Sequence, residues 1–160
     1  DQVTVHMPAI EVVAGGLYGS LGVPKRVNAS EDDYARCRKT MATLGVESIA
    51  DRDVMTLSTG QARRVLFARA LVHDPDVVFL DEPYSGLDPH AVDIFDQLIE
   101  KQRAGRTFVM VSHDLRKGFD MCTHALVLAR GRVVTFGPKD QLDFDEFSEL
   151  YRSTVGMGVS

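Results

Sequence analysis

The first part of the chain carries apolar residues at the three- and four-residue spacing of a helix with one buried face. Ile10, Val13 and Leu17 follow Pro8 in this way, and proline is favoured in the first turn of a helix. We therefore expect a short helix after Pro8. The glycine pair that opens segment 15–24 predicts its end, because glycine-rich segments are typical of loops.

A second amphipathic pattern starts after Ser30, a residue type that caps helices. Three acidic residues follow it, which suits the positive end of a helix dipole. Gly45 predicts the end of this helix. Its apolar face is formed by Tyr34, Cys37, Met41 and Leu44.

Beyond residue 57 the pattern changes, and apolar runs of strand length alternate with helical patterns. The expected helices begin near residues 58, 89 and 114, and the expected strands are 77–81, 107–112, 125–129 and 132–136. Arg130 and Gly131 separate the last two strands and predict a tight hairpin. Apolar strands alternating with helices indicate an α/β fold with a mostly parallel sheet covered on both faces. The acidic tail, residues 137–160, is expected to end in a helix.

The composition is that of a globular protein, with 44% hydrophobic and 26% charged residues among 160. No apolar run approaches the roughly 18–20 residues that span a bilayer. The net charge is −5 and no region is strongly basic, so we expect no nucleic-acid partner. Cys37 and Cys122 are expected to stay reduced. Because the chain begins at Asp1 and shows no signal peptide, we expect an N-terminal portion to precede it.

Two carboxylates follow the apolar run 77–80 directly. Asp81 and Glu82 thus stand at the carboxyl end of an expected buried strand, where open α/β sheets bind their ligands. Such a pair suits a cation or acid–base chemistry, because burying unpaired carboxylates is unfavourable. One carboxylate can hold hydrated magnesium and the other can orient a water molecule. The plainer alternative is a strand that ends in a polar turn.

Residues 57–61 (Leu-Ser-Thr-Gly-Gln) open the helix expected near residue 58. The free N–H groups at such a helix end attract anions. Ser58 adds a hydroxyl group, and Gly60 allows close approach of a ligand to the backbone. The plainer alternative is that Ser58 only caps the helix.

Residues 112–114 (Ser-His-Asp) follow another expected strand. They cannot form a nucleophilic triad, because neighbouring strand residues point to opposite faces. Next to a phosphate, His113 would donate a hydrogen bond; otherwise it is an ordinary polar residue. The remaining histidines show no metal-ligand spacing and are interpreted as structural: His6, His73, His90 and His124.

Together these segments resemble the motifs of ATP-binding cassette (ABC) proteins, in the order and spacing of that family. Residues 57–61 (the signature segment) resemble the signature motif, residues 77–82 the Walker B motif, residues 85–88 (the D-loop segment) the D-loop, and His113 the switch histidine. The hairpin around Arg130 is also similar. The resemblance implies a partial P-loop NTPase (RecA-like) core, residues 57–136, with an ABC helical subdomain, residues 1–56, and an acidic tail, residues 137–160.

The same resemblance implies the role of each site residue. Asp81 would position Mg²⁺, Glu82 would be the general base, and His113 would contact the γ-phosphate of ATP. Four residues of the signature segment would clamp the nucleotide of the opposite subunit in a head-to-tail dimer: Ser58, Thr59, Gly60 and Gln61. Asp88 would communicate across that interface. The implied protein hydrolyses ATP to drive a transmembrane permease, and it lies in the cytoplasm on the inner face of the membrane.

The sequence departs from the family pattern in two respects. Thr59 stands where the family most often has glycine. No Gly-x-x-x-x-Gly-Lys-Ser/Thr loop (Walker A) occurs in these 160 residues, so we expect the chain alone to be inactive. Gln2 is a candidate for the family's Q-loop glutamine, although its spacing is short.

Two other functions remain open at this point. One is a non-transport ABC ATPase that acts on nucleic acid or ribosomes, which the lack of basic regions disfavours. The other is a non-catalytic regulatory module that has lost the phosphate loop. The presence of both Glu82 and His113 disfavours it, because a module without catalysis needs neither.

Overall fold

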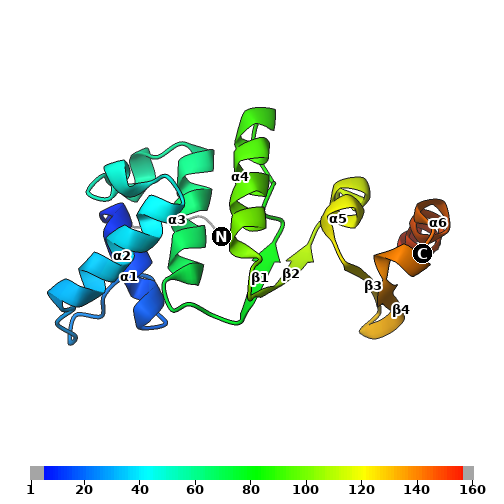
Figure 1. Cartoon of the computed structure of the whole chain (residues 1–160), viewed down its shortest axis with the longest axis horizontal. Helices are drawn as coiled ribbons and strands as arrows, with labels where there is room; N and C mark the ends of the chain where they lie inside the picture. Colours follow the sequence, from blue (N-terminus) through cyan, green and yellow to red (C-terminus); the bar gives the residue numbers. More distant parts are fainter. Residues whose placement is uncertain (1–5, 157–160) are drawn as a thin grey trace. The chain divides into compact units, whose positions relative to one another are not determined.

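The computed structural model describes residues 6–156 and divides into two compact units, one ending at Val109 and one beginning at Met110 (Figure 1). The expected mixture of helices and parallel strands is confirmed. The division at Val109 follows packing within the chain. The three-part division 1–56, 57–136 and 137–160 stays a prediction.

Three helices of the first unit pack against one another: α1 (Ala9–Leu17), α2 (Glu31–Thr43) and α3 (Thr59–Leu71). Two short 3-10 helices, Glu47–Ile49 and Val54–Thr56, connect α2 to α3. The side chains between these helices are almost fully buried and form an apolar core, which includes Val12, Val13, Cys37, Met41, Leu44 and Val65. The helices expected after Pro8, Ser30 and residue 57 are therefore confirmed.

The predicted end of α1 at its glycine pair is wrong, because Gly15 and Gly16 lie inside the helix. The reason is a close approach of two elements. A Cβ atom on Gly16 would overlap the backbone carbonyl of Arg69 in α3, and one on Gly15 would overlap the backbone of Ser20. Glycine is needed here for close packing, and the pair does not end the helix.

Two tyrosine hydroxyls fasten α1 to α2. Tyr34 in α2 donates a hydrogen bond to Glu11 in α1 at 2.5 Å, and Tyr18 at the end of α1 donates to Asp33 in α2 at 2.9 Å. The Glu11 contact and partial burial raise the pKa of Tyr34 to about 12. Asp33 also completes a capping box with Ser30, so the predicted helix start is confirmed.

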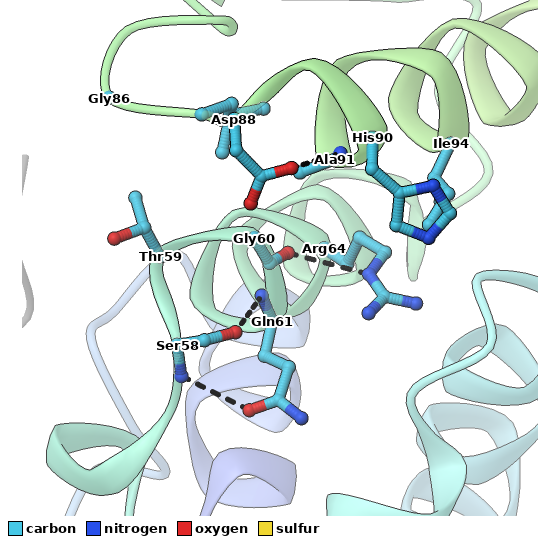
Figure 2. A pocket seen from close by; sticks show the side chains of 11 residues that line it. Ser58, Thr59, Gly60, Gln61, Arg64, Gly86, Asp88, His90, Ala91 and Ile94 are labelled. Atoms are coloured by element: carbon cyan, nitrogen blue, oxygen red, sulfur yellow. Dashed lines mark hydrogen bonds between the residues drawn. The ribbon is translucent and has the colours of Figure 1, made fainter.

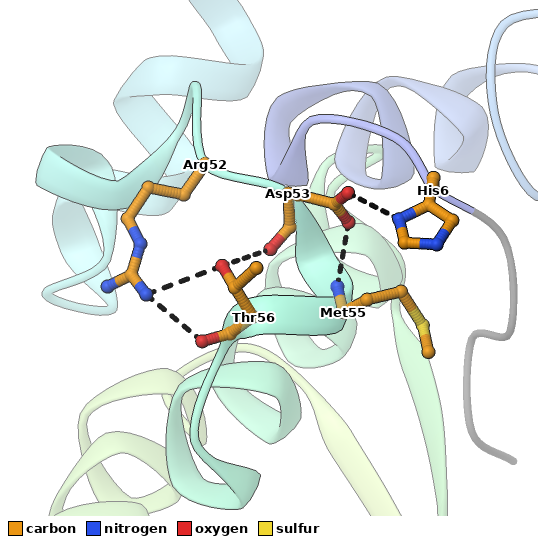
Figure 3. Close-up of polar contacts among 5 residues, drawn as sticks. All are labelled: His6, Arg52, Asp53, Met55 and Thr56. Carbon is orange, nitrogen blue, oxygen red and sulfur yellow. Dashed lines mark hydrogen bonds and ion pairs between the residues drawn. The ribbon is translucent and has the colours of Figure 1, made fainter.

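The start of the described chain is held to the end of the helical region (Figure 3). His6 Nδ1 lies 2.6 Å from the Asp53 carboxylate, and Pro8 forms an isolated bridge with Asp53. The hydrogen bond to His6 lowers the pKa of Asp53. Nearby, Arg52 donates to the backbone carbonyl of Thr56 at 3.0 Å.

A βαβ crossover follows: β1 (Val77–Asp81), α4 (Pro89–Gln102) and β2 (Thr107–Val111), with β1 and β2 as hydrogen-bonded neighbours. A helical crossover of this kind joins parallel strands. Asp88 caps α4 and Pro89 opens it, as predicted. One face of the sheet carries Val78 and Phe108. The ring centroids of Phe108 and of Phe67 in α3 lie 6.1 Å apart.

The expectation that the sheet is covered on both faces is wrong for the described residues. Val78 is 3% exposed, but Phe79 beside it is 76% exposed. Val77 and Val109 are exposed as well. Successive strand residues point to opposite faces, so Val77 and Phe79 share the uncovered face. The apolar run 77–80 predicted the strand correctly and its burial incorrectly.

The second unit contains α5 (Leu115–Met121), the antiparallel hairpin of β3 (His124–Ala129) and β4 (Arg132–Pro138), and α6 (Phe144–Gly156). The hairpin turns at Arg130 and Gly131, whose φ angles are both positive, at 48° and 72°. Positive φ at both central residues is the geometry of a tight type I′ turn, as predicted. The core of this unit is formed by Phe119, Ala125, Val127 and Phe147.

In the part of the chain that the structure describes, none of the helices has the length and apolar character needed to cross a membrane. Cys37 and Cys122 are both free thiols. Burial raises the pKa of Cys37 to about 11.

Candidate functional site

The signature segment forms the start of α3 through a reciprocal pair of hydrogen bonds. The Ser58 hydroxyl accepts from the backbone N–H of Gln61 at 3.3 Å, and the Gln61 side chain accepts from the backbone N–H of Ser58 at 3.1 Å. This capping box fixes the first turn of the helix. Thr59 and Gly60 occupy the first two helical positions, where backbone N–H groups have no acceptor within the helix.

The D-loop segment leads from β1 into α4 through a tight turn. Gly86 has a φ of 75°, which glycine adopts readily. Glu82, at the start of the turn, has a φ of 45°, a conformation that costs a side-chain-bearing residue about 1–3 kcal/mol. At the end of the turn, the Asp88 carboxylate accepts from the backbone N–H of Ala91 at 2.9 Å and caps α4.

The two segments face each other across a cleft of about 430 Å³ (Figure 2). One wall is the start of α3, and the opposite wall is the D-loop segment with the start of α4. The lining residues are Ser58, Thr59, Gly60, Gln61, Arg64, Gly86, Leu87, Asp88, His90, Ala91 and Ile94. Five site residues predicted from the sequence therefore lie together: Ser58, Thr59, Gly60, Gln61 and Asp88.

The charges around the cleft suit an anionic ligand. The N-termini of α3 and α4 both lie at the cleft, and each carries a partial positive charge. Arg64 adds a full positive charge, while its guanidinium donates to the backbone carbonyl of Gly45 at 3.3 Å. Asp88 supplies a negative charge on the opposite wall, so a ligand that contacts both walls needs anionic groups together with hydrogen-bond donors.

Asp81 and Glu82 are in the same unit but do not line this cleft. Asp81 is exposed at the carboxyl end of β1. Glu82 is half-buried, and its Oε1 atom is buried. His113 is exposed and follows β2 in the second unit. Within the first unit, the structure therefore groups the signature and D-loop segments and leaves Asp81 and Glu82 outside their cleft.

Within residues 6–156, no group of three or more His, Cys, Asp or Glu side chains could hold a metal ion. Asp81 by itself fits the needs of magnesium bound with a nucleotide, because that ion takes one or two carboxylates together with phosphates and water. Gln2, the Q-loop candidate, lies outside the described residues.

The sequence interpretation missed two residues that line the cleft. Arg64 lies one helical turn after Gly60, so the helical spacing could have placed it on the same face. His90 was interpreted as structural because it lacks ligand spacing. The structure places it in α4, two residues after Asp88 and on the cleft wall.

Comparison with known proteins gives a consistent result. A sequence model of the ABC transporter family matches residues 2–85. The chain is 37% identical over 125 residues to the zinc import ATP-binding protein ZnuC of Halorhodospira halophila, covering 76% of this chain and 48% of the relative. It is 35% identical to the thiamine import ATP-binding protein ThiQ of Jannaschia sp., covering 74% and 53%. The chain thus spans about half the length of these relatives.

Two solved structures share the fold. One is a nucleotide-free ATP-binding cassette from an ABC transporter, with a TM-score of 0.78, 23% identity, and coverage of 96% of this chain and 63% of that chain. The other is cbiO1 from Clostridium perfringens, part of the ABC transporter complex cbiONQ, with a TM-score of 0.69 and 29% identity. It covers 92% of this chain and 55% of that chain. The predicted partial P-loop NTPase fold is confirmed.

Proposed function

The chain belongs to the ABC transporter family, and we propose that it is the C-terminal portion of an ATP-hydrolysing subunit. The observation that carries the proposal is the cleft between the signature and D-loop segments. These segments are separated in sequence by β1 and its following turn, yet they form the two walls of one anion-suited cleft. A polar turn or a helix cap by itself does not require this arrangement.

We assign the carboxylates after β1 to the nucleotide that the subunit itself holds. Asp81 would hold Mg²⁺, which would neutralise phosphate charge when ATP is bound. Glu82 accepts a proton from the attacking water. The left-handed backbone of Glu82 supports this role, because strained residues are concentrated at functional sites. His113 donates a hydrogen bond to the γ-phosphate.

The cleft residues serve the opposite subunit in this proposal. Ser58, Thr59, Gly60 and Gln61 contact the phosphates and ribose of the nucleotide held by that subunit, and Asp88 contacts the subunit itself. Each nucleotide is then enclosed by two chains. Binding energy from ATP closes the dimer, and a transmembrane permease on the inner face of the cell membrane uses that motion.

The replacement Glu82→Gln in the full-length protein tests the assignment of the base. It keeps the shape of the side chain and removes its ability to accept a proton at neutral pH. We expect ATP hydrolysis to fall by about two or more orders of magnitude. ATP binding and the ATP-dependent dimer should persist, as measured by isothermal titration and size-exclusion chromatography.

Glu100→Gln is the matched control, because Glu100 is an exposed residue of α4 outside the cleft. It pairs with Arg103 three residues later, a surface contact that contributes little. The control should hydrolyse ATP at the rate of the unmodified protein. Full turnover in Glu82→Gln would rule out Glu82 as the base.

A further inference from the structure

One hydrogen bond and two close approaches relate the signature helix α3 to the D-loop segment and the start of α4. The Arg63 guanidinium donates to the backbone carbonyl of Ser85 at 3.3 Å. The Thr59 methyl group lies 3.8 Å from the position that a Cβ atom on Gly86 would occupy. At the first turn of α4, the Cβ atom of Ala91 lies only 3.3 Å from the position that a Cβ atom on Gly60 of α3 would occupy. The two walls of the cleft therefore lie close together at these residues.

Arg63 differs from three other basic side chains in or just after α3 in the part of the chain that it contacts. Arg64, Arg69 and His73 contact backbone carbonyls that precede α3 in the sequence, namely those of Gly45, Ser20 and Leu17. Arg63 instead contacts a backbone carbonyl that follows α3 in the sequence, that of Ser85 after β1. It is thus placed to hold the turn that leads to Asp88.

Within that turn the described backbone hydrogen bonds are local, and the ring of Tyr84 packs edge-on against that of Phe95 in α4, with 6.0 Å between the ring centroids. Ser85 and Leu87 donate their N–H groups to the carbonyls of Glu82 and Tyr84, each at 3.1 Å, and both bonds are local. Two of its residues, Glu82 and Gly86, have positive φ angles. The Arg63 guanidinium adds a donor from a neighbouring helix, which ties the turn to an element outside it.

We infer that Arg63 is a positioning residue, which fixes the D-loop segment to the signature helix so that both walls of the cleft meet the opposite subunit as one surface. Thr59, at a position where the family most often has glycine, assists through its methyl group, which lies beside Gly86. The inference rests on the proposed function for its consequence. The contact between the two segments stands independently of that function.

Hydrogen exchange of the full-length protein tests the contact without any nucleotide. Arg63→Met keeps the apolar stem of the side chain and removes its donors. We expect the amides of Ser85 and Leu87 to exchange about three- to tenfold faster, the range that the loss of one hydrogen bond gives. Arg52→Met is the matched control, because Arg52 also donates to a backbone carbonyl, that of Thr56. It should leave the Ser85 and Leu87 amides unchanged.

The consequence is tested by ATP-driven dimerisation of the same variants in the Glu82→Gln background. Arg63→Met should raise the ATP concentration for half-maximal dimerisation severalfold. The ATP affinity of the separate subunit should stay unchanged. Arg63→Lys, which keeps the positive charge, should bring the half-maximal concentration part of the way back. A change that merely lowers stability would also appear in Arg52→Met and would not be restored by lysine.

Thr59→Ser gives a second measurement, because it removes the methyl group and retains the hydroxyl. It should also speed exchange at Leu87. If Arg63→Met and Thr59→Ser leave the exchange of the D-loop segment unchanged, the positioning role is wrong. If the exchange rate rises but the ATP concentration for half-maximal dimerisation does not change, the positioning role is also wrong. Failure of Glu82→Gln itself to dimerise with ATP would instead overturn the proposed function, while faster exchange would still support the contact.

Discussion

Three side chains that line the cleft also cap helices. Ser58 and Gln61 cap α3 reciprocally, and Asp88 caps α4. The sequence alone offered helix capping and ligand binding as alternatives for Ser58. In the structure the capping side chains also line the cleft, so the two tasks are compatible. Loss of a cap lowers stability by about 0.5–2 kcal/mol, and a test of ligand binding must separate this effect.

Ser58→Arg in the full-length protein makes that separation. The arginine side chain would fill the cleft and block the approach of the opposite subunit's nucleotide, so we expect ATP-driven dimerisation to be lost. The subunit should still bind ATP through its own phosphate loop. Isothermal titration measures the affinity of the separate subunit, and light scattering measures the dimer.

Ser30→Arg is the control for the loss of a cap. Ser30 forms the same capping box at α2, with Asp33, and lies outside the cleft. Both variants should lose a similar amount of thermal stability, but only Ser58→Arg should lose the dimer. If Ser58→Arg also abolishes ATP binding by the separate subunit, Ser58 contacts the nucleotide of its own chain and the assignment to the opposite subunit is wrong.

The sequence was most informative where a residue type has few uses. Glycine at residue 60 and acidic residues at 81 and 82 pointed to chemistry, and spacing linked them to one family. Arg64 was missed because arginine on a helix is common and usually solvated, and His90 was interpreted as structural because it lacks ligand spacing. Only the packing of α3 beside α4 places both of them at the cleft. The assigned roles of Asp81, Glu82 and His113 stay predictions.

At the scale of the element, local signals predicted helix starts well and burial poorly. Capping residues placed the starts of α2, α3, α4 and α5 correctly, because the capping contacts lie within four residues. The end of α1 was misplaced, since Gly16 is required by the approach of Arg69, which is distant in sequence, and Gly15 by the approach of the chain that turns back at Ser20. The burial of β1 was misjudged for a similar reason: an apolar run does not say which segment covers each face.

The contact between α1 and α2 yields a prediction for alkaline pH. The hydrogen bond to Glu11 requires the neutral form of Tyr34, whose pKa is raised from 10.0 to about 12. A raised folded-state pKa contributes stability that is complete below the unfolded pKa and is lost as pH rises through the folded pKa. The full-length protein should therefore lose this contribution between about pH 10 and pH 12.

Urea unfolding of the native protein and of Tyr34→Phe measures the effect. The free energy of unfolding should differ most between the native protein and Tyr34→Phe at about pH 9, and the difference should shrink toward about pH 12. Tyr151→Phe, in the second unit, corrects for the general effect of alkali on the fold. A difference that stays constant across this range would show that the Tyr34–Glu11 bond does not control the titration.

At the scale of the whole molecule, each unit exposes an apolar sheet face. In the first unit this face includes Val77 and Phe79 of β1 with Val109 of β2. In the second, the hairpin face opposite the core carries Leu126, Leu128, Val133 and Phe136, all exposed. Contiguous exposed apolar patches mark interaction surfaces or make a protein prone to aggregate. The chain also matches only about half the length of its relatives.

These faces predict that the 160 residues produced by themselves are poorly stable and neither bind nor hydrolyse ATP appreciably. Uncovered apolar residues and unpaired strand edges forgo several kcal/mol, comparable with the roughly 5–15 kcal/mol that stabilises a whole domain. The family's phosphate loop, with its lysine, is also missing from this sequence. A thermal melt should be broad, and isothermal titration with magnesium-ATP should give little heat. A sharp cooperative melt together with micromolar ATP affinity would show that the chain is self-sufficient and that the exposed faces need no further cover.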